Sequence, residues 1–304
     1  MIAAKSLGLT LALDLVFEEV PERLHPVVYF GRIVSLFDRE WSRPVLVGSL
    51  VALVLPIAAA VTAWGVTNVA IGFHVSAGIV VAALLLFSTT SLRLLVRVAD
   101  DVVEGSASEL ARAKESVVAL VGREVETLTA AEIRSAAVES VAENLSDGLV
   151  APLVAFVIGA QFSLAVGVAT AVWVKGVNTL DSMLGYPDKP HGWASARLDD
   201  LVMWLPARVT ALLLAVVSRK PRTLLKATRW RTRTASPNAG WPMATMAAIL
   251  DVRLVKSGAY EFHTDASLPS VEEAQRGIRT VTHTGILAFV LAILLVVLTA
   301  EVTP

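Results

Sequence analysis

The sequence predicts an all-α, polytopic integral membrane protein whose polar helical loops lie on the cytoplasmic face. Hydrophobic residues make up 55% of the 304 residues and charged residues only 17%, and the mean hydropathy of +0.66 is well above that of soluble domains. We expect one integral membrane domain over residues 1–304. Its apolar segments lie near 1–17, 45–73, 75–96, 148–174, 201–217 and 284–300, and its polar loops are 97–147, 175–200 and 218–283.

Crossing a bilayer takes about 20 apolar residues, and three segments meet that length without interruption. These are 45–73, 75–96 and 284–300. The segments 1–17 and 201–217 are short, so each either spans the membrane with support from other segments or lies in the membrane–water interface. The segment 148–174 is long enough, but a Gly-Ala-Gln break at 159–161 divides it. The break permits one kinked helix or a re-entrant hairpin, and only the hairpin returns the chain to the side it left.

The charge pattern indicates which side faces the cytosol. Seven basic residues and no acidic one lie between Arg219 and Arg233, and such loops are typically cytoplasmic. If residues from all the polar loops form one site, the segments 148–174 and 201–217 must either both span the membrane or both fail to span it. In the first case 175–200 faces outward or lies at membrane depth. In the second, which we favour, every polar loop shares the cytoplasmic face of a multi-pass protein in the cell membrane.

The composition and motifs exclude several classes of function. A net charge of -1 argues against a nucleic-acid partner. The absence of cysteine removes disulfides, thiolate metal sites and cysteine nucleophiles. The chain has no GxxxxGK[ST], GxGxxG, HExxH or GxSxG motif, so any nucleotide must be held by an unusual site.

Three carboxylates are expected on one face of a helix near residues 130–144. Thr129 with Glu132 three residues later predicts a capping box at its start. The carboxylates follow at i, i+4 and i+8, with an asparagine beside them: Glu139, Glu143, Asp147 and Asn144. Like charges at this spacing repel, and a hydrated magnesium ion carrying nucleotide phosphates would relieve the repulsion. The alternative is a solvated helix face.

The densest polar group lies in 175–200, between two apolar segments. Its members are Asn178, Asp181, Arg197, Asp199 and Asp200. Such groups are costly beside a membrane when unpaired, and they crowd here into a loop rich in turn residues, which favours a functional site. The alternative is a local ion pair between Arg197 and Asp200 at i, i+3, together with a polar cap.

Two smaller patches complete the set of candidate residues. The side chains of His25 and Arg32 could bind an anionic ligand, although a lone His at a membrane interface more often has a structural role. Trp241 follows Asn238 in a Pro- and Gly-containing turn, where it could stack on a flat ligand or anchor at the lipid headgroups.

Together these blocks resemble the CobD/CbiB family, the adenosylcobinamide-phosphate synthases of cobalamin biosynthesis. The matching strings are HPVVYFGR (25–32), VGRE (121–124), ESVAENLSDGLVAPL (139–153), KGVNTLDSMLGY (175–186), SARLDDLVMWLPAR (195–208) and SPNAGW (236–241). They occur in the family's order over nearly the whole chain, which is a stronger signal than any single motif.

The resemblance implies a membrane ligase that joins a propionate carboxyl of adenosylcobyric acid to the amine of aminopropanol or its phosphate, using ATP and Mg2+. A carboxylate is a poor electrophile, so such an enzyme is expected to activate it as an acyl phosphate. It then needs cations to hold the phosphates and a base to keep the amine neutral. The implied partners are the corrinoid and amine substrates, the lipid bilayer and other membrane enzymes of late cobalamin assembly.

The resemblance also suggests a role for each candidate residue. The expected magnesium ligands are Glu139, Glu143 and Asp147. The expected catalytic residues are Glu143, Asn144, Asp147, Asn178, Asp181, Arg197, Asp199 and Asp200. Arg123 and Asn238 are expected to contact the nucleotide, and His25, Arg32 and Trp241 the substrates.

The chain departs from the family's pattern at the outer rim of the expected site. Glu18–Pro21 replaces a Gly-Asp-Pro string, Val125 replaces the threonine of a GRDT string, Met243 replaces an acidic residue, and Lys256–Ala259 replaces a Gly-Gly-Pro-Asn tract. Altered substrate preference or reduced catalysis would follow. The rival functions are a catalytically altered corrinoid-binding or AmpE-like regulatory membrane protein, and a transporter, for which no inverted repeat is found.

Overall fold

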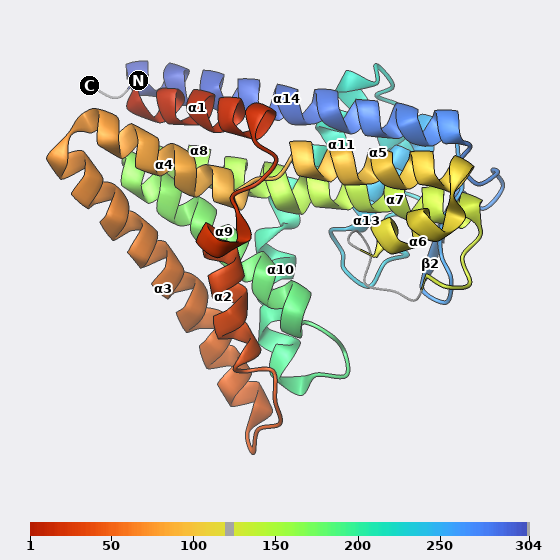
Figure 1. Ribbon diagram of the computed structural model, residues 1–304, viewed down its shortest axis with the longest axis horizontal. Coiled ribbons are helices and arrows are strands. Elements are labelled where there is room, and N and C mark those ends of the chain that lie inside the picture. The colour runs from red at the N-terminus through yellow and green to blue at the C-terminus, as the bar shows by residue number, and fades with distance from the viewer. Residues whose placement is uncertain (119–124, 303–304) are drawn as a thin grey trace. The chain divides into compact units, whose positions relative to one another are not determined.

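The computed structural model describes residues 1–118 and 125–302, and it confirms an all-α architecture (Figure 1). Within the described residues, the strands are a two-stranded antiparallel hairpin of β1 (Leu254–Lys256) and β2 (Tyr260–Phe262). The described chain forms two compact units. The first unit comprises Met1–Ser91, Asp147–Met203 and the chain from Ala288; the second comprises Leu92–Ser146 and Trp204–Leu287. The expectation of one membrane domain stays a prediction.

In the described part of the chain, four helical stretches are long and apolar enough to cross a membrane: Pro44–Phe73, Val75–Ser108, Ala130–Ala160 and Val271–Thr299. The bent pair Pro190–Val202 and Trp204–Val217 would make a fifth. These stretches confirm the class of membrane protein, while the side of each loop stays a prediction. The stretch from Ala130 differs from the expectation of a polar loop over 97–147. The first half of this stretch is rich in Ala, Ser and Val, and these small side chains are buried on every face of the helix. The helix therefore has only a weak division into a polar and an apolar face.

The first unit is built around one long helix. Its elements are α1 (Ile2–Val16), η1 (Glu22–Leu24), α2 (Pro26–Ser35), α3 (Pro44–Phe73), α4 (Val75–Thr89), the π-helical turn η2 (Ser146–Val150), α8 (Ala151–Ala160), α9 (Leu164–Leu184), η3 (Pro190–Gly192), α10 (Trp193–Val202) and the C-terminal part of α14 (Val271–Val302). α9 packs against α3, α4, α8 and α10, so it is the central helix of this unit.

The apolar segment 148–174 folds as a helical hairpin. The chain reverses between α8 and α9, and the Thr170 hydroxyl donates a hydrogen bond to the Ala155 carbonyl oxygen at 2.8 Å across the two helices. A side chain at Gly159 would meet the backbone of α9, so glycine lets the helices approach closely. The structure therefore has the hairpin and not the single kinked helix, the two alternatives that the sequence left open.

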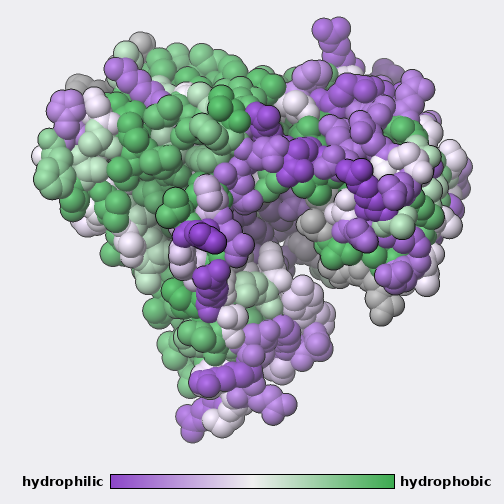
Figure 2. All heavy atoms as spheres, viewed as in Figure 1, coloured by the Kyte–Doolittle hydropathy of each residue, from purple (hydrophilic) through white to green (hydrophobic). Residues whose placement is uncertain are grey.

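α3 has an apolar outer face. Eleven of its large hydrophobic side chains are exposed, among them Leu50, Leu53, Ile57, Val61 and Trp64. Figure 2 shows hydrophobic surface over α3 and α4 and hydrophilic surface near the start of α3. An apolar face of this length is stable in contact with lipid chains and costly in water, as expected for a membrane-spanning helix.

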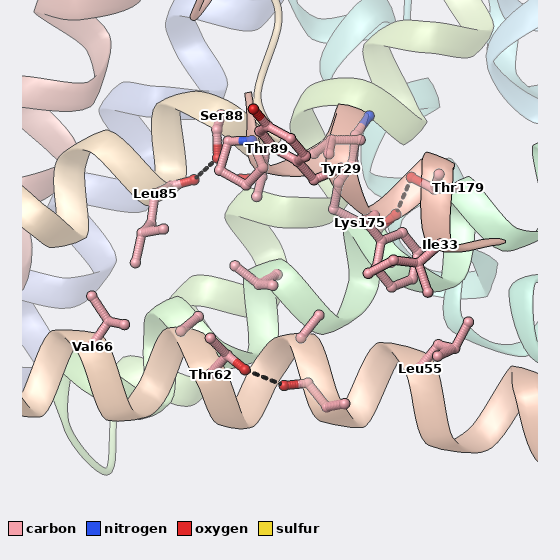
Figure 3. Close-up of a pocket in the computed structure, with 18 residues that line it drawn as sticks. Tyr29, Ile33, Leu55, Thr62, Val66, Leu85, Ser88, Thr89, Lys175 and Thr179 are labelled. Atoms are coloured by element: carbon pink, nitrogen blue, oxygen red, sulfur yellow. Dashed lines mark hydrogen bonds between the residues drawn. The ribbon is translucent and has the colours of Figure 1, made fainter. Parts of the chain in front are cut away.

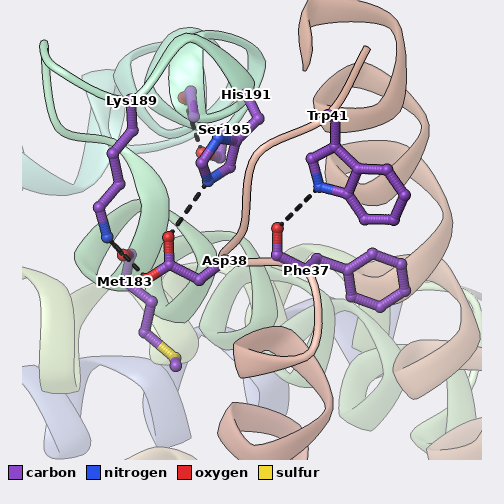
Figure 4. Close-up of polar contacts among 8 residues, drawn as sticks. Phe37, Asp38, Trp41, Met183, Lys189, His191 and Ser195 are labelled. Atoms are coloured by element: carbon purple, nitrogen blue, oxygen red, sulfur yellow. Dashed lines mark hydrogen bonds and ion pairs between the residues drawn. The ribbon is translucent and has the colours of Figure 1, made fainter. Parts of the chain in front are cut away.

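A polar clamp holds the loop after α2 to the turn before α10 (Figure 4). Lys189 Nζ donates a hydrogen bond to Asp38 Oδ2 at 2.8 Å and another to the Met183 carbonyl oxygen at 3.2 Å. His191 Nε2 lies 3.3 Å from Asp38 Oδ1. Because the hydrogen bond from Lys189 lowers the pKa of Asp38, the carboxylate stays ionised and the clamp fixes where α10 begins.

The second unit surrounds α7 (Ala130–Leu145). Its other elements are α5 (Arg93–Ser108), α6 (Leu110–Val117), α11 (Trp204–Val217), α12 (Thr223–Ala227), α13 (Gly240–Leu250), the β1–β2 hairpin and the N-terminal part of α14. The predicted capping box is confirmed: the Glu132 amide donates to Thr129 Oγ1 at 3.3 Å, and the Thr129 amide donates to Glu132 Oε2 at 2.9 Å.

Close approach of α3 to η3 gives a test of this packing. A Cβ at Gly48 would overlap the His191 carbonyl, whereas a Cβ at Gly65, on the same helix, meets nothing within 4 Å. We expect Gly48→Ala to lower the free energy of unfolding by about 1–3 kcal/mol through overpacking. Gly65→Ala should leave it unchanged or raise it by up to about 1 kcal/mol. Denaturant unfolding of the two detergent-solubilised variants measures this, and equal stabilities would contradict the close approach.

Candidate functional site

Four aspartates and one asparagine gather in the first unit, from three elements. They are Asp147 of η2, Asn178 and Asp181 of α9, and Asp199 and Asp200 of α10. We call these five residues the acidic cluster. A side chain at Gly192 would overlap the Leu184 carbonyl, so glycine permits the tight connection that lays α10 back along α9. Sequence reasoning singled out all five residues, and the structure brings them together.

Asp199 is the centre of the acidic cluster. Its side chain is only 7% exposed, and its carboxylate accepts a hydrogen bond from Asn178. It also interacts electrostatically with the other three aspartates. Its Oδ1 is buried and has no hydrogen-bond partner among the residues that the structure describes. A buried carboxylate oxygen without a partner is costly, so this oxygen is suited to a cation or a donor that a ligand supplies.

Asp181 has the proton affinity of a group that can exchange protons near neutral pH. Burial, and to a lesser extent the nearby carboxylate of Asp200, raises the pKa of Asp181 to about 6. A base works best when its pKa is close to the pH of the reaction. Asp181 can therefore accept a proton more readily than an ordinary aspartate.

Lys175 is a cation beside the acidic cluster that sequence reasoning quoted but gave no role. It lies one turn before Asn178 on α9 and interacts with the carboxylates of Asp147 and Glu19. Burial lowers the pKa of Lys175, and these two negative charges oppose that effect. A lysine inside an otherwise apolar stretch was the signal that could have marked it.

Arg197 makes the local ion pair that the sequence offered as an alternative. Its Nη1 lies 3.6 Å from Asp200 Oδ2, and its side chain is 68% exposed. An exposed pair of this kind contributes little to stability. Arg197 therefore lies at the solvent edge of the acidic cluster, where an incoming anion can reach it.

Glu139 stabilises the packing of the second unit. It is 2% exposed, and its carboxylate accepts hydrogen bonds from the Ser135 hydroxyl at 2.7 Å and the Tyr260 hydroxyl at 2.9 Å. The Val255 amide donates to the Ser135 hydroxyl at 2.8 Å. These bonds attach both strands of the β1–β2 hairpin to α7.

The structure does not gather Glu139, Glu143 and Asp147 into a three-carboxylate metal site. The π-helical turn η2 interrupts the regular helical period that would place Asp147 on the same face as Glu139 and Glu143. Across residues 1–118 and 125–302, no group of three or more His, Asp or Glu side chains is arranged to hold a metal ion. Asn144, expected beside them, donates to the Ser140 carbonyl oxygen at 2.9 Å within its own helix.

His25 and Arg32 have local partners in the first unit. The Val27 amide donates to His25 Nδ1 at 3.2 Å, so His25 caps α2, and its Nε2 lies 3.2 Å from Glu19 Oε1. Arg32 lies 3.3 Å from Glu22 Oε1 at the surface. The structural role that the sequence offered for His25 is thus present, and a substrate role for either residue stays a prediction.

Asn238 and Trp241 meet two arginines in the second unit. Arg208 Nη1 donates to Asn238 Oδ1 at 3.1 Å, and the guanidinium groups of Arg208 and Arg231 lie 5.4 Å and 4.7 Å from the Trp241 ring centroid. Sequence reasoning missed both arginines, although Arg208 closes the WLPAR string and Arg231 lies in the basic run. Arg123, the other residue expected to contact the nucleotide, lies outside the described residues.

The first unit also contains an apolar cavity of about 380 Å³ between α2, α3, α4 and α9 (Figure 3). Its polar side chains mostly bond to their own helices: Thr62 to the Ala58 carbonyl at 2.8 Å and Ser88 to the Leu85 carbonyl at 2.7 Å. Lys175 is the charged residue of its lining. The cavity therefore suits an apolar group.

The fold and this site define the class: an integral membrane protein with several spans and a half-buried acidic site next to a lysine. The chain matches the family model described as "CobD/Cbib protein" over residues 7–298. Because this match covers nearly the whole length, the chain belongs to the CobD/CbiB family.

Relatives with curated names agree with that assignment. The chain is 34% identical to the "Probable cobalamin biosynthesis protein CobD" of Methanothrix thermoacetophila, with 95% of this chain and 96% of the relative aligned. It is 38% identical to the "Cobalamin biosynthesis protein CobD" of Geobacter metallireducens, over 82% of this chain and 80% of the relative. The protein of the same name from Klebsiella pneumoniae is 36% identical over 88% and 86%. No solved structure matches the chain.

The contacts of Glu139 predict a structural phenotype. Glu139→Ala leaves the Ser135 and Tyr260 hydroxyls without their acceptor, so we expect the free energy of unfolding to fall by about 3 kcal/mol. The affinity for Mg2+ should not change. Glu115→Ala, at an exposed position on α6, is the matched control and should change neither. An unchanged stability together with weakened Mg2+ binding would restore the metal role.

Proposed function

We propose that this protein forms an amide bond in cobalamin biosynthesis. It joins a propionate carboxyl of adenosylcobyric acid to the amine of aminopropanol or aminopropanol phosphate and consumes ATP. Membership of the CobD/CbiB family and the names of the relatives, which place them in cobalamin biosynthesis, support the pathway. The chemistry of the acidic cluster supports the reaction type.

The observation that carries the proposal is the convergence of three separate sequence blocks on Asp199. Asp147 comes from the ESVAENLSDGLVAPL block, Asn178 and Asp181 from the KGVNTLDSMLGY block, and Asp199 from the SARLDDLVMWLPAR block. Helix packing alone would be better served by apolar residues at these buried positions. A set of half-buried carboxylates is instead suited to a reaction that handles a divalent cation, phosphate and an amine.

The residues fit a magnesium ion bound together with a nucleotide. Asp199 Oδ1 is buried without a partner in the described chain, and Asp147 and Asp181 supply further oxygens nearby. Since no three carboxylates among the described residues are arranged to hold an ion by themselves, phosphate oxygens and water would complete its shell, as magnesium prefers. ATP, when bound, would supply the phosphoryl group that makes the propionate carboxyl reactive.

The chain's own groups would then position the reactants and move the proton. Asp181, with its pKa of about 6, would accept the proton that the amine loses. Lys175 would oppose the negative charge of the acidic cluster and the phosphates, and Arg197 would attract an anionic group at the solvent edge. The polar loops would lie on the cytoplasmic face, where ATP is available.

The apolar surroundings would hold the corrinoid. The cavity between α2, α3, α4 and α9 is much smaller than a corrin ring with its side chains, so it would take only a peripheral apolar group. The site would therefore lie where a bulky amphiphilic substrate can rest against the membrane domain while its carboxyl reaches the acidic cluster. A role for Asn238, Trp241 and Arg123 in contacting nucleotide or substrate stays a prediction from the family resemblance.

The test is product formation by purified, detergent-solubilised protein given adenosylcobyric acid, Mg-ATP and either amine, followed by mass spectrometry. We expect an amide product that depends on ATP. Asp199→Asn should lower kcat/KM by at least about 100-fold because the central carboxylate ligand for a cation is lost. Asp188→Asn removes an exposed carboxylate of the same loop and should retain activity. No product with either amine, or equal activity of the two variants, would contradict the proposal.

A further inference from the structure

The second unit contains a cluster of two cations on one indole ring. Arg208 of α11 lies over both Trp204, at 4.4 Å, and Trp241, at 5.4 Å, and Arg231 lies over Trp241 at 4.7 Å. Asn238 is 3% exposed and accepts a hydrogen bond from Arg208. We call Arg208, Arg231, Asn238 and Trp241 the guanidinium cluster.

The backbone is shaped to form this cluster. A Cβ at Gly240 would overlap the Arg231 carbonyl, so only glycine lets the start of α13 lie against the segment that carries Arg231. The Trp241 amide donates to the Asn238 carbonyl at 2.9 Å, and the Asn238 amide donates to the Ser236 hydroxyl at 3.2 Å. These contacts hold the Trp241 ring beside both guanidinium groups.

No described residue balances the charge of the two arginines in the guanidinium cluster. Within the described residues, neither Arg208 nor Arg231 forms an ion pair with a carboxylate, and the run from Arg219 to Arg233 contains no acidic residue. The Arg231 Nε and Trp241 Nε1 atoms are buried and have no hydrogen-bond partner in the part of the chain that the structure describes. Two like charges and two unused donors are unfavourable together unless an acceptor with negative charge binds between them.

We propose that the guanidinium cluster is a binding site for a phosphoryl oxyanion. The planar guanidinium group offers paired donors that match phosphate oxygens, and stacking on Trp241 keeps both groups oriented. Arg208 Nη1 already donates to the Trp204 carbonyl oxygen at 2.6 Å and to Asn238 Oδ1 at 3.1 Å. Arg208 therefore offers its remaining N–H groups, and Arg231 supplies the others. An indole N–H and the Arg231 Nε–H add donors of fixed direction. The site stands on this geometry and does not depend on the amide-forming activity proposed above.

Two sources carry this chemistry: a soluble phosphate compound, such as a nucleotide or a phosphorylated amine, and the headgroup of an anionic phospholipid. The probe for the first is inorganic pyrophosphate, titrated calorimetrically into full-length protein in a neutral detergent without corrinoid or amine. The probe for the second is the same protein in nanodiscs of phosphatidylcholine with or without phosphatidylglycerol, scored by retention of phosphatidylglycerol in native mass spectrometry.

The variant is Arg231→Gln, and its matched control is Arg229→Gln, which removes the same charge from an exposed position two residues away. We expect Arg231→Gln to weaken binding of one probe at least tenfold, Arg231→Lys to restore part of it, and Arg229→Gln to leave it within twofold. Weakened pyrophosphate binding identifies a soluble phosphate, and weakened phosphatidylglycerol retention identifies a lipid headgroup.

Binding of neither probe, or equal weakening by Arg231→Gln and Arg229→Gln, would overturn the site, because general basicity would then explain any attraction. Circular dichroism of the variants separates loss of binding from loss of fold. Because the readout is binding alone, failure of this site and failure of the amide-forming activity are distinguished.

Discussion

A carboxyl group that is buried in an apolar protein needs hydrogen-bond partners or a cation, and the first unit depends on that constraint. Asp199 is buried beside three other aspartates and receives a hydrogen bond from Asn178, yet its Oδ1 has no partner in the described chain. Lys175 and, at the solvent edge, Arg197 are cations that the fold itself places nearby. The crowding of carboxyl groups around an oxygen without a partner is why the acidic cluster is interpreted as a site for a cation and its phosphates, and not as part of the core.

The rest of the first unit maintains this costly arrangement by close backbone packing. Glycines at positions 48, 159 and 192 let α3, α8 and α10 approach their neighbours, and the clamp of Asp38 with Lys189 and His191 fixes the start of α10. The apolar face of α3 supplies the contact with lipid. Such packing holds the carboxylates in place through the backbone, so their side chains need not bond to one another.

The sequence predicted the apolar segments, the capping box at Thr129 and all members of the acidic cluster, because periodicity and residue type report them directly. It could not show that Glu139 bonds to Tyr260, which is 121 residues away, so the magnesium role given to Glu139, Glu143 and Asp147 finds no support in the geometry. The sequence also could not show that the guanidinium groups of Arg208 and Arg231 lie over the same indole ring, that of Trp241. The magnesium role stays a prediction, and both features depend on contacts between distant segments, which local spacing does not encode.

The most direct test of the account is whether Asp199 holds a divalent cation. Mn2+ substitutes for Mg2+ and loses its free-ion electron paramagnetic resonance signal when it binds. Titration of the purified protein with Mn2+ in the presence of a non-hydrolysable ATP analogue should show one tight site in the unmodified protein and at least tenfold weaker binding in Asp199→Asn. Equal binding by both proteins, with the variant correctly folded, would contradict the central role of the acidic cluster.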